Sequence, residues 1–283
     1  MHKTKKLILL MLLLAILLPF IFSKKLNSWL SPRDINKANI FQEIGIKIAN
    51  LKKTNSSSEE EEIEESFETI FKPIEKPYRI LIMGDSLVAV AGGFGDIIEQ
   101  KLIKLDDIEV LRKGKVSSGM SRPDYFDWKK ESKTLLESFN PNIAIVMMGT
   151  NDAQSFENQE REVLFYGTEE WDKEYKNRII AFDKQLTNHN IRVFKIGLPQ
   201  MKDTAYAEKI QHINKLNKEA SEENEQVTFI SGEELLDGYQ AFMPDENGIM
   251  RATRLDDGIH LTYFGGSLLV DQVINELKNY LIL

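Results

Sequence analysis

The chain has 283 residues, of which 42% are hydrophobic, and this is enough for one α/β domain with an additional tail. Its net charge of -8, without a basic stripe interleaved with aromatic residues, argues against nucleic-acid binding. Cysteine is absent, which excludes disulfides, thiolate nucleophiles and cysteine-rich metal sites but leaves the cellular compartment open. Histidine occurs only at positions 2, 189, 212 and 260, so a mechanism that needs imidazole has few candidates.

Residues 1–25 have the pattern of a membrane anchor or a signal segment. Lysines flank both ends of an unbroken apolar run from Leu7 to Phe22. As a helix, about 16 residues span roughly 24 Å, slightly short of a usual bilayer span. Bulky residues stand where a signal peptidase prefers small ones, so an uncleaved anchor is favoured over a cleaved signal peptide. We therefore expect a single-pass protein of the cytoplasmic membrane with its remaining residues extracytoplasmic, although the flanking lysines favour this orientation only weakly.

Residues 26–75 are expected to connect this segment to the body of the chain. Ser31 to Lys53 has apolar residues at near-helical spacing, which predicts a modest amphipathic helix. Asn55 to Glu65 is a serine run followed by a glutamate-rich run, and it cannot bury enough apolar surface to order itself. We interpret it as a solvated linker, with an acidic interaction surface as the alternative.

Residues 76–283 alternate short apolar runs with longer helical patterns. Repetition of strand, loop, helix and strand predicts an α/β domain, in which a central parallel sheet is covered by helices on both faces. The predicted strands are Arg79–Met83, Ile143–Met148, Arg192–Ile196 and Val227–Ile230, and the predicted helices are Leu87–Leu105, Glu170–Asn188, Tyr206–Glu223 and Thr262–Leu281.

Several polar residues follow the predicted strands or precede the last helix. Ser86 comes after the first strand, Asn151 and Asp152 come after the second, and Asp257 and His260 come just before the last helix. Ligands of parallel sheets bind at the carboxyl ends of the strands. We therefore expect these five residues to share one rim of the domain.

The segment Gly84-Asp85-Ser86-Leu87 can form a tight strand-to-helix turn. Its serine then lies at a helix N-terminus, where the hydroxyl faces the cleft and free backbone N–H groups stabilise developing negative charge. Taken alone, the tetrapeptide is better explained by simple capping of the helix than by catalysis.

The segment Asp257-Gly258-Ile259-His260 strengthens a catalytic interpretation. An aspartate three residues before a histidine can bind its Nδ1 side and leave Nε2 to accept a proton from the hydroxyl of Ser86. Asp256 competes for the same role, and the three-residue spacing favours Asp257. The pattern predicts a Ser-His-Asp triad.

Other candidate residues have two readings each. The amide of Asn151 could point at an oxyanion, yet Gly149-Thr150-Asn151-Asp152 is also an ordinary turn sequence. Tyr125 and Trp128 could line a sugar-binding cleft or pack in the core. Asp85 and Asp152 are assigned to hydrogen bonds that fix loops, and His189 and His212 to solvated surface.

In this order and at these relative positions, the segments around Ser86, Asn151 and His260 resemble the blocks of the GDSL/SGNH hydrolase superfamily. The resemblance covers roughly Tyr78 to Leu283. It implies a three-layer flavodoxin-like sandwich and assigns Gly119, in Ser117-Ser118-Gly119, to the second block. It also implies an oxyanion hole made of the Ser86 and Gly119 backbone N–H groups and the Asn151 side chain.

The segments Arg122–Trp128 and Arg254–Thr262 resemble most closely a bacterial envelope branch known as DUF459. That branch is similar to SGNH proteins that remove or transfer acetyl groups on cell-envelope glycans. The resemblance implies an esterase acting on O-acetyl esters of such glycans through an acyl-enzyme, with envelope acetylation proteins as partners. An O-acetyltransferase and a non-catalytic envelope assembly protein are the alternatives.

Cofactor chemistry finds little support in the sequence. Gly84 to Gly95 lacks the G-x-G-x-x-G pattern, and no lysine follows at P-loop spacing. A metallohydrolase would need ligands beyond Asp256, Asp257 and His260. We expect neither a cofactor nor a metal.

Overall fold

The computed structural model describes residues 74–283 of the chain. The apolar run Leu7–Phe22, and the predicted linker before residue 74, lie outside the described residues. Among the helices of residues 74–283, none combines the length and apolarity that crossing a membrane requires.

The centre of the domain is a five-stranded sheet in which all neighbouring strands are parallel. Its strands lie in the order β2-β1-β3-β6-β7, which is the flavodoxin-like order 2-1-3-4-5 when only these strands are counted along the chain. The predicted α/β fold with a central parallel sheet is therefore confirmed. The strands are β1 (Tyr78–Gly84), β2 (Ile108–Gly114), β3 (Ile143–Met147), β6 (Arg192–Ile196) and β7 (Val227–Ile230).

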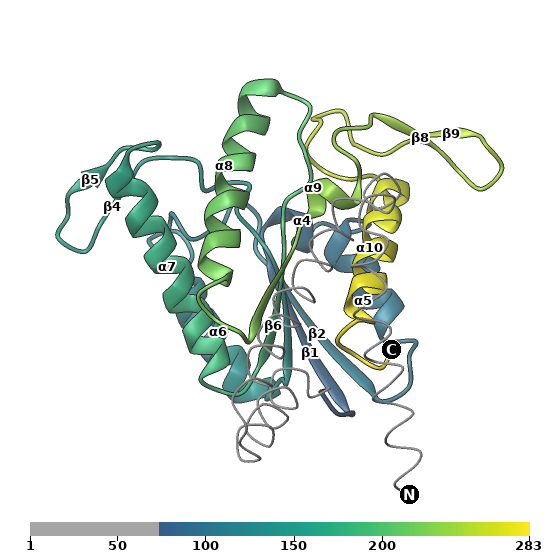
Figure 1. Cartoon of the computed structure of the whole chain (residues 1–283), viewed down its shortest axis with the longest axis horizontal. Coiled ribbons are helices and arrows are strands. Elements are labelled where there is room, and N and C mark those ends of the chain that lie inside the picture. Colours follow the sequence, from purple (N-terminus) through teal and green to yellow (C-terminus); the bar gives the residue numbers. More distant parts are fainter. Residues whose placement is uncertain (1–73) are drawn as a thin grey trace, which may run out of the picture. The chain divides into compact units, whose positions relative to one another are not determined.

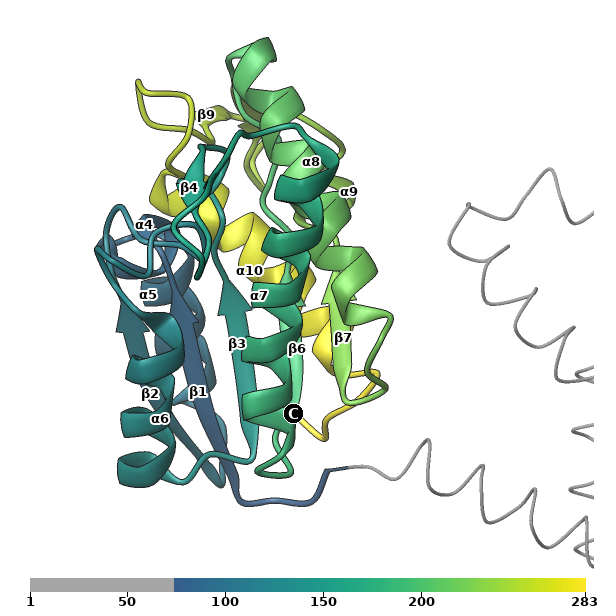
Figure 2. The same ribbon diagram turned by 90° about the vertical axis from the view of Figure 1, so that its left-hand side faces the viewer.

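Helices cover both faces of the sheet, as Figures 1 and 2 show. One layer consists of α5 (Phe94–Leu102) and α10 (Tyr263–Leu277). The other consists of α6 (Trp128–Phe139), α7 (Glu169–Thr187) and α8 (Thr204–Ser221). Two four-residue helices, α4 (Ser86–Ala89) and α9 (Gly232–Leu235), follow β1 and β7 directly.

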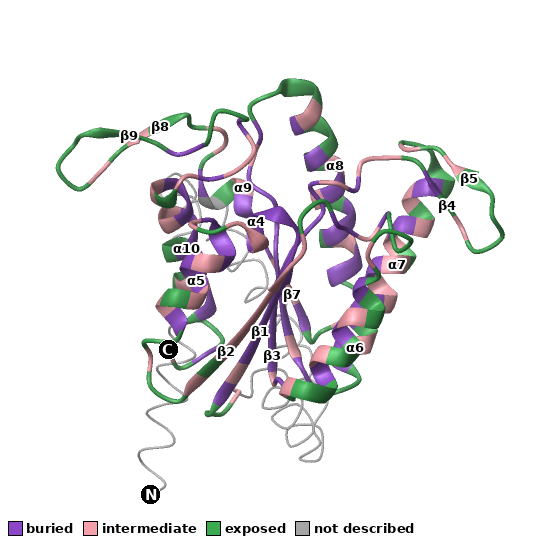
Figure 3. Ribbon diagram, turned by 180° about the vertical axis from the view of Figure 1, so that it is seen from behind, coloured by how far each residue is buried: buried purple, intermediate pink, exposed green. Residues whose placement is uncertain are grey.

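Two hairpins extend from the edge of the sheet at which the strands end. The first pairs β4 (Phe156–Glu157) with β5 (Val163–Leu164), and the second pairs β8 (Phe242–Pro244) with β9 (Met250–Ala252). Figure 3 shows both hairpins largely exposed, whereas β1 and β3 are buried along nearly their whole length. The two short antiparallel ribbons flank the carboxyl ends of the strands.

The core forms because β1 and β3 are apolar on both sides. Leu81 and Met83 pack in a cluster with Trp128 of α6 and Phe182 of α7, while Ile82 belongs to the cluster that includes α5 and α10. Complete burial of one such aliphatic side chain contributes about 1.5 to 3 kcal/mol. This two-sided burial holds the carboxyl edge of β1 in a fixed place.

The structure differs from the predicted elements in two respects. The predicted helix Leu87–Leu105 is divided into α4 and α5, because Gly92 has a φ of +72° between them. Neither β2 nor α6 was predicted. Strand β2 is half-buried and mixes charged with apolar residues, so it carries no strong strand pattern. Helix α6 does have apolar residues at helical spacing, at Trp128, Leu135, Leu136 and Phe139, and the prediction overlooked them.

Candidate active site

Ser86 lies at the point where β1 turns into α4. The strand ends at Gly84, where a Cβ atom would lie 2.0 Å from the Met147 carbonyl oxygen, so glycine is required for this close approach of β1 and β3. Asp85 caps α4 by accepting a hydrogen bond from the Leu87 N–H at 3.0 Å. Ser86 is thereby fixed as the first residue of the helix, at the carboxyl edge of the central strand.

His260 reaches Ser86 from a turn that precedes α10. Its Nε2 lies 2.8 Å from Ser86 Oγ, and its Nδ1 lies 2.7 Å from Asp257 Oδ2. The second oxygen, Asp257 Oδ1, accepts the backbone N–H groups of Ile259 at 2.8 Å and of His260 at 2.9 Å. The three side chains therefore form one hydrogen-bonded series from carboxylate to imidazole to hydroxyl.

The electrostatics of this series keep the carboxylate ionised. Burial acts to raise the pKa of Asp257, but the hydrogen bonds from His260 and from the Ile259 N–H outweigh it and hold that pKa below its ordinary value. An ionised carboxylate on Nδ1 favours the tautomer in which Nδ1 carries the proton and Nε2 accepts one from Ser86. Asp256 is exposed and makes no hydrogen bond within residues 74–283, so the structure brings Asp257 to the histidine.

Three N–H donors lie on the loops around Ser86. The Ser86 N–H has no intrahelical acceptor, because it is the first of α4. The Gly119 N–H donates to no protein group in the described part of the chain. The Asn151 Nδ2 donates to the Ser118 carbonyl oxygen and to Thr150 Oγ1, both at 3.1 Å. Asn151 thus links its own turn to the loop that carries Gly119.

Asp85 is fully buried and connects the Ser86 turn to the loop after β3. Its Oδ2 accepts the N–H groups of Gly149 at 3.0 Å and Thr150 at 2.9 Å, and the Thr150 hydroxyl at 2.7 Å. Burial raises the pKa of Asp85, and the hydrogen bonds from Thr150, Leu87 and Gly149 act against that rise. The predicted role in fixing loops agrees with these contacts.

Asp152 connects the same loop to the one after β2. Its carboxylate accepts the N–H groups of Met120 at 3.0 Å and Ser121 at 2.9 Å, and the Tyr175 hydroxyl at 2.8 Å. A Cβ atom on Gly119 would lie 2.0 Å from Asp152 Oδ1, so this loop position requires glycine. Burial raises the pKa of Asp152, and the negative charge of Asp85 adds to the rise.

Sequence reasoning missed the residues that support this edge from the helices. Tyr175 of α7 binds Asp152, and the Tyr206 hydroxyl of α8 donates to the Thr150 carbonyl oxygen. Burial, followed by the charges of Asp85 and Asp152, raises the pKa of Tyr206 to about 12, so its hydroxyl remains a donor. Neither tyrosine carries a local signal, because each is remote in sequence from its partner.

The two aromatic candidates differ in position. The interpretation of Trp128 as a cleft residue is wrong, because its side chain is 1% exposed and packs edge-on against Phe126 in the core. Its indole N–H donates to Ser118 Oγ at 3.0 Å, which supports the loop of Gly119 from below. Tyr125 is exposed, and its hydroxyl donates to the Val116 carbonyl oxygen.

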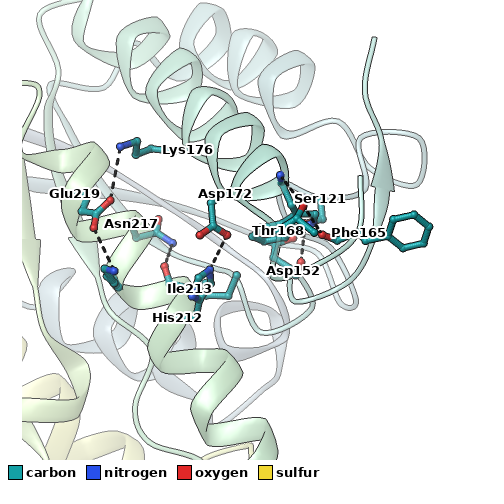
Figure 4. Close-up of polar contacts among 12 residues, drawn as sticks. Ser121, Asp152, Phe165, Thr168, Asp172, Lys176, His212, Ile213, Asn217 and Glu219 are labelled. Atoms are coloured by element: carbon teal, nitrogen blue, oxygen red, sulfur yellow. Dashed lines mark hydrogen bonds and ion pairs between the residues drawn. The ribbon is translucent and has the colours of Figure 1, made fainter. Parts of the chain in front are cut away.

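The other histidines lie away from Ser86. His189 is exposed just beyond the end of α7, as predicted. The prediction of solvated surface is wrong for His212, which is half-buried with its Nε2 2.7 Å from Asp172 Oδ1 (Figure 4). Within residues 74–283 no three histidine, aspartate or glutamate side chains gather as metal ligands.

A family model described as "Protein of unknown function (DUF459)" matches residues 79–276, which is more than half of the chain. The chain belongs to the DUF459 family. This confirms the branch that the segments around Trp128 and His260 suggested. A search of curated proteins found no match to this DUF459 chain.

Several solved structures have a similar fold. An α/β hydrolase enzyme, LAE5, from the metagenome of Lake Arreo in Spain superposes with a TM-score of 0.56 at 11% identity, covering 73% of this chain and 98% of LAE5. TesA gives a TM-score of 0.52 at 16% identity, with 71% and 99% covered. A catalytic mutant of Axe2, an acetylxylan esterase from Geobacillus stearothermophilus, gives 0.52 at 15% identity, with 72% and 96% covered. These likenesses show that the chain shares the α/β fold of these enzymes.

Proposed function

We propose that this chain is a serine-dependent esterase in which Ser86 is the nucleophile, His260 the general base and Asp257 the residue that orients it. The observation that carries the proposal is the continuous series from Asp257 through His260 to Ser86 at the carboxyl edge of the sheet, with distances of 2.7 and 2.8 Å. A hydroxyl, an imidazole and a carboxylate in this order form the constellation that activates serine in acyl transfer.

In the first half of the reaction, Ser86 Oγ attacks the carbonyl carbon of the ester while its proton passes to His260 Nε2. The tetrahedral intermediate then collapses, the bond to the alcohol oxygen breaks, and His260 returns the proton to the departing alcohol. An acyl-enzyme at Ser86 remains. Asp257 stays ionised throughout and stabilises the imidazolium, and its lowered pKa suits that role.

The negative oxygen of the intermediate is assigned to the N–H groups of Ser86 and Gly119 and to the Asn151 amide. The first two donors have no protein acceptor within residues 74–283. Asn151 exchanges its bond to Thr150 Oγ1 for one to the oxyanion and keeps its bond to the Ser118 carbonyl oxygen. One such donor contributes about 2.7 to 4 kcal/mol of barrier lowering.

The proposed substrate class is acyl, principally O-acetyl, esters of cell-envelope glycans. Support comes from the resemblance of the DUF459 branch to proteins that act on acetylated glycans and from the acetylxylan esterase of similar fold. The exposed Tyr125 ring is a candidate for stacking on a sugar. Deacylation by water completes an esterase cycle, whereas deacylation by a glycan hydroxyl would make the same acyl-enzyme an O-acetyltransferase.

The apolar run Leu7–Phe22 supports the further proposal that the protein is anchored in the cytoplasmic membrane with its catalytic domain outside. The acidic stretch near residue 60 would then act as a spacer between membrane and domain. Acylated glycans and proteins of envelope acetylation are the proposed partners.

The activity is tested by acetate release from activated acetyl esters with the purified full-length chain. We expect turnover by the wild type and an acetyl adduct of Ser86 detectable by mass spectrometry after rapid acid quenching. Ser86→Ala should lose both, while Ser138→Ala, on the exposed side of α6, should behave as the wild type. Equal turnover by Ser86→Ala and the wild type would reject the proposal.

A further inference from the structure

The turn that carries His260 is a short antiparallel ribbon, and this fixes which side chains lie beside the imidazole. Arg254 and Leu261 form an antiparallel bridge, and the next pair is closed by the Leu255 N–H donating to the His260 carbonyl oxygen at 2.8 Å. Side chains of directly opposed residues in antiparallel segments lie on the same face. The side chain of Leu255 therefore lies next to that of His260.

The two faces of this ribbon have opposite surroundings. Arg254 and Leu261 point to the buried face, and both side chains are almost inaccessible. Leu255 is 46% exposed, although it is a large aliphatic residue. The exposed Leu255 side chain is thus on the same face of the ribbon as the imidazole that contacts Ser86.

The backbone donors of the ribbon are already engaged. The Gly258 N–H donates to the Leu255 carbonyl oxygen at 2.9 Å, and the N–H groups of Ile259 and His260 both donate to Asp257. The Leu255 N–H is used in the pair with His260. These N–H groups are therefore not free to recognise a substrate. Leu255 adds an accessible carbon surface to the ribbon, and Asp257, also exposed, is already bound to the imidazole.

We propose that Leu255 is a specificity-determining residue that contacts the alcohol part of the substrate, an inference that rests on the proposed function. His260 returns its proton to the ester oxygen, so the departing alcohol must lie beside the imidazole. The substrate class favoured by Leu255 is an alcohol with a carbon-rich ring next to its hydroxyl, such as a sugar ring.

The same position serves an incoming alcohol if the acyl group is transferred. In that step His260 removes the proton from the acceptor hydroxyl, the new C–O bond forms, and the bond to Ser86 Oγ breaks, with the proton passing back to Ser86. By microscopic reversibility the acceptor occupies the place of the departing alcohol. Leu255 thus acts in both directions of the reaction.

The test compares two acetates that differ only in their alcohol, namely cyclohexyl acetate and ethyl acetate, with the full-length chain. The readout is the ratio of the two kcat/KM values, which cancels the fraction of active enzyme. We expect Leu255→Ser to lower this ratio about three- to tenfold, because a half-exposed aliphatic contact is lost for the ring and little is lost for the ethyl group. Methyl 6-O-acetylglucoside should follow cyclohexyl acetate.

Two further variants make the result specific. Leu255→Met keeps the carbon surface and should retain the wild-type ratio. Ile282→Ser removes an exposed aliphatic side chain near Tyr78, at the opposite edge of the sheet, and should also leave the ratio unchanged. A Leu255→Ser enzyme that hydrolyses both acetates at an unchanged ratio overturns the role of Leu255, including the case in which both rates fall equally. Absence of hydrolysis in the wild type, together with failure of a fluorophosphonate to label Ser86, overturns the proposed function itself.

Discussion

Residues 74–283 contain two histidine–aspartate pairs with the same contact distance and different surroundings. In each pair the ring nitrogen and carboxylate oxygen are 2.7 Å apart, and the histidine side chains are 25% and 30% exposed for His260 and His212. Asp257 binds Nδ1 of His260 and leaves Nε2 to Ser86, whereas Asp172 binds Nε2 of His212. Pairing with a carboxylate therefore does not distinguish the two histidines. The Ser86 hydroxyl at the other nitrogen of His260 does, and it is the reason for proposing His260 as the base.

The elements around the two pairs support the same distinction. His212 joins α8 to Asp172 of α7 (Figure 4). Its ring lies edge-on to Tyr166 with a centroid distance of 5.7 Å. It is a packing contact between two helices. His260 instead lies in a turn at the carboxyl edge of the sheet, beside the loops of Ser86 and Gly119, whose own N–H groups have no protein acceptor within residues 74–283. Loss of the first pair should affect stability, and loss of the second should affect turnover.

The largest expected effect comes from replacing each histidine. His260→Gln should lower kcat about 10⁴-fold or more, because the general base and acid are lost together. His212→Gln should change kcat less than about twofold. Initial rates on an activated acetyl ester, with circular dichroism to show that both variants are folded, measure the difference. Comparable losses in the two variants would contradict the distinction.

The aspartates provide the next comparison. Asp257→Asn should lower kcat about 10⁴-fold by favouring the wrong tautomer of His260, while Asp172→Asn and Asp256→Asn should have mild effects. Hydrogen bonds hold the pKa of Asp257 below the ordinary aspartate pKa of about 4. Its carboxylate therefore stays charged until the pH falls below that ordinary pKa. The wild-type rate should therefore not decline through Asp257 between about pH 7 and pH 5. A stronger loss in Asp256→Asn than in Asp257→Asn would reassign the acid.

The sequence predicts the contact between Asp257 and His260 but not the contacts between α7 and α8, and the reason is physical. The spacing of Asp257 and His260 is local, so four residues suffice to predict their contact, and the apolar runs of β6 and β7 gave the same bounds that the structure has. Contacts between remote segments leave no local pattern. The bond from Tyr175 to Asp152 and the pairing of His212 with Asp172 depend on how α7 and α8 pack, and they were not predicted.

The sequence also did not show which aromatic side chains are buried. Tyr125 and Trp128 are three residues apart and both aromatic, yet Tyr125 is exposed and Trp128 is buried in the cluster that includes Leu81 and Phe182. Only the packing of α6 against the sheet decides between them. Strand β2 was missed because it lies at the edge of the sheet, where a strand need not be continuously apolar.

Two asparagine side chains extend the comparison to the amides near each pair. Asn151→Ala should lower kcat about 10²- to 10³-fold with little change in KM, because a donor to the oxyanion is lost. The Asn217 amide donates to the Ile213 carbonyl oxygen at 3.0 Å within α8. Asn217→Ala should lower the free energy of unfolding by only about 0.5 to 1.5 kcal/mol. Steady-state kinetics and urea unfolding of both variants measure these effects. A loss of kcat in Asn217→Ala as large as that in Asn151→Ala would contradict the assignment of Asn151 as an oxyanion donor.

The smallest effect concerns the His212–Asp172 contact itself. A double-mutant cycle of His212→Ala and Asp172→Ala, followed by urea unfolding, should give a coupling energy of about 0 to 1 kcal/mol, since both side chains are partly exposed. Turnover should be unaffected in all three variants. A loss of turnover in these His212 and Asp172 variants, without unfolding, would show that the pair takes part in the reaction.

The most direct test of the central claim is covalent labelling of Ser86 by a serine-directed fluorophosphonate. Labelling requires the hydroxyl, its base and the oxyanion donors to act together, which an unactivated surface serine does not provide. We expect stoichiometric labelling of the wild type at Ser86 by peptide mass spectrometry, near-complete loss in Ser86→Ala and His260→Gln, and wild-type labelling in His212→Gln. Labelling that persists in folded Ser86→Ala, or is absent from the wild type, would contradict the account.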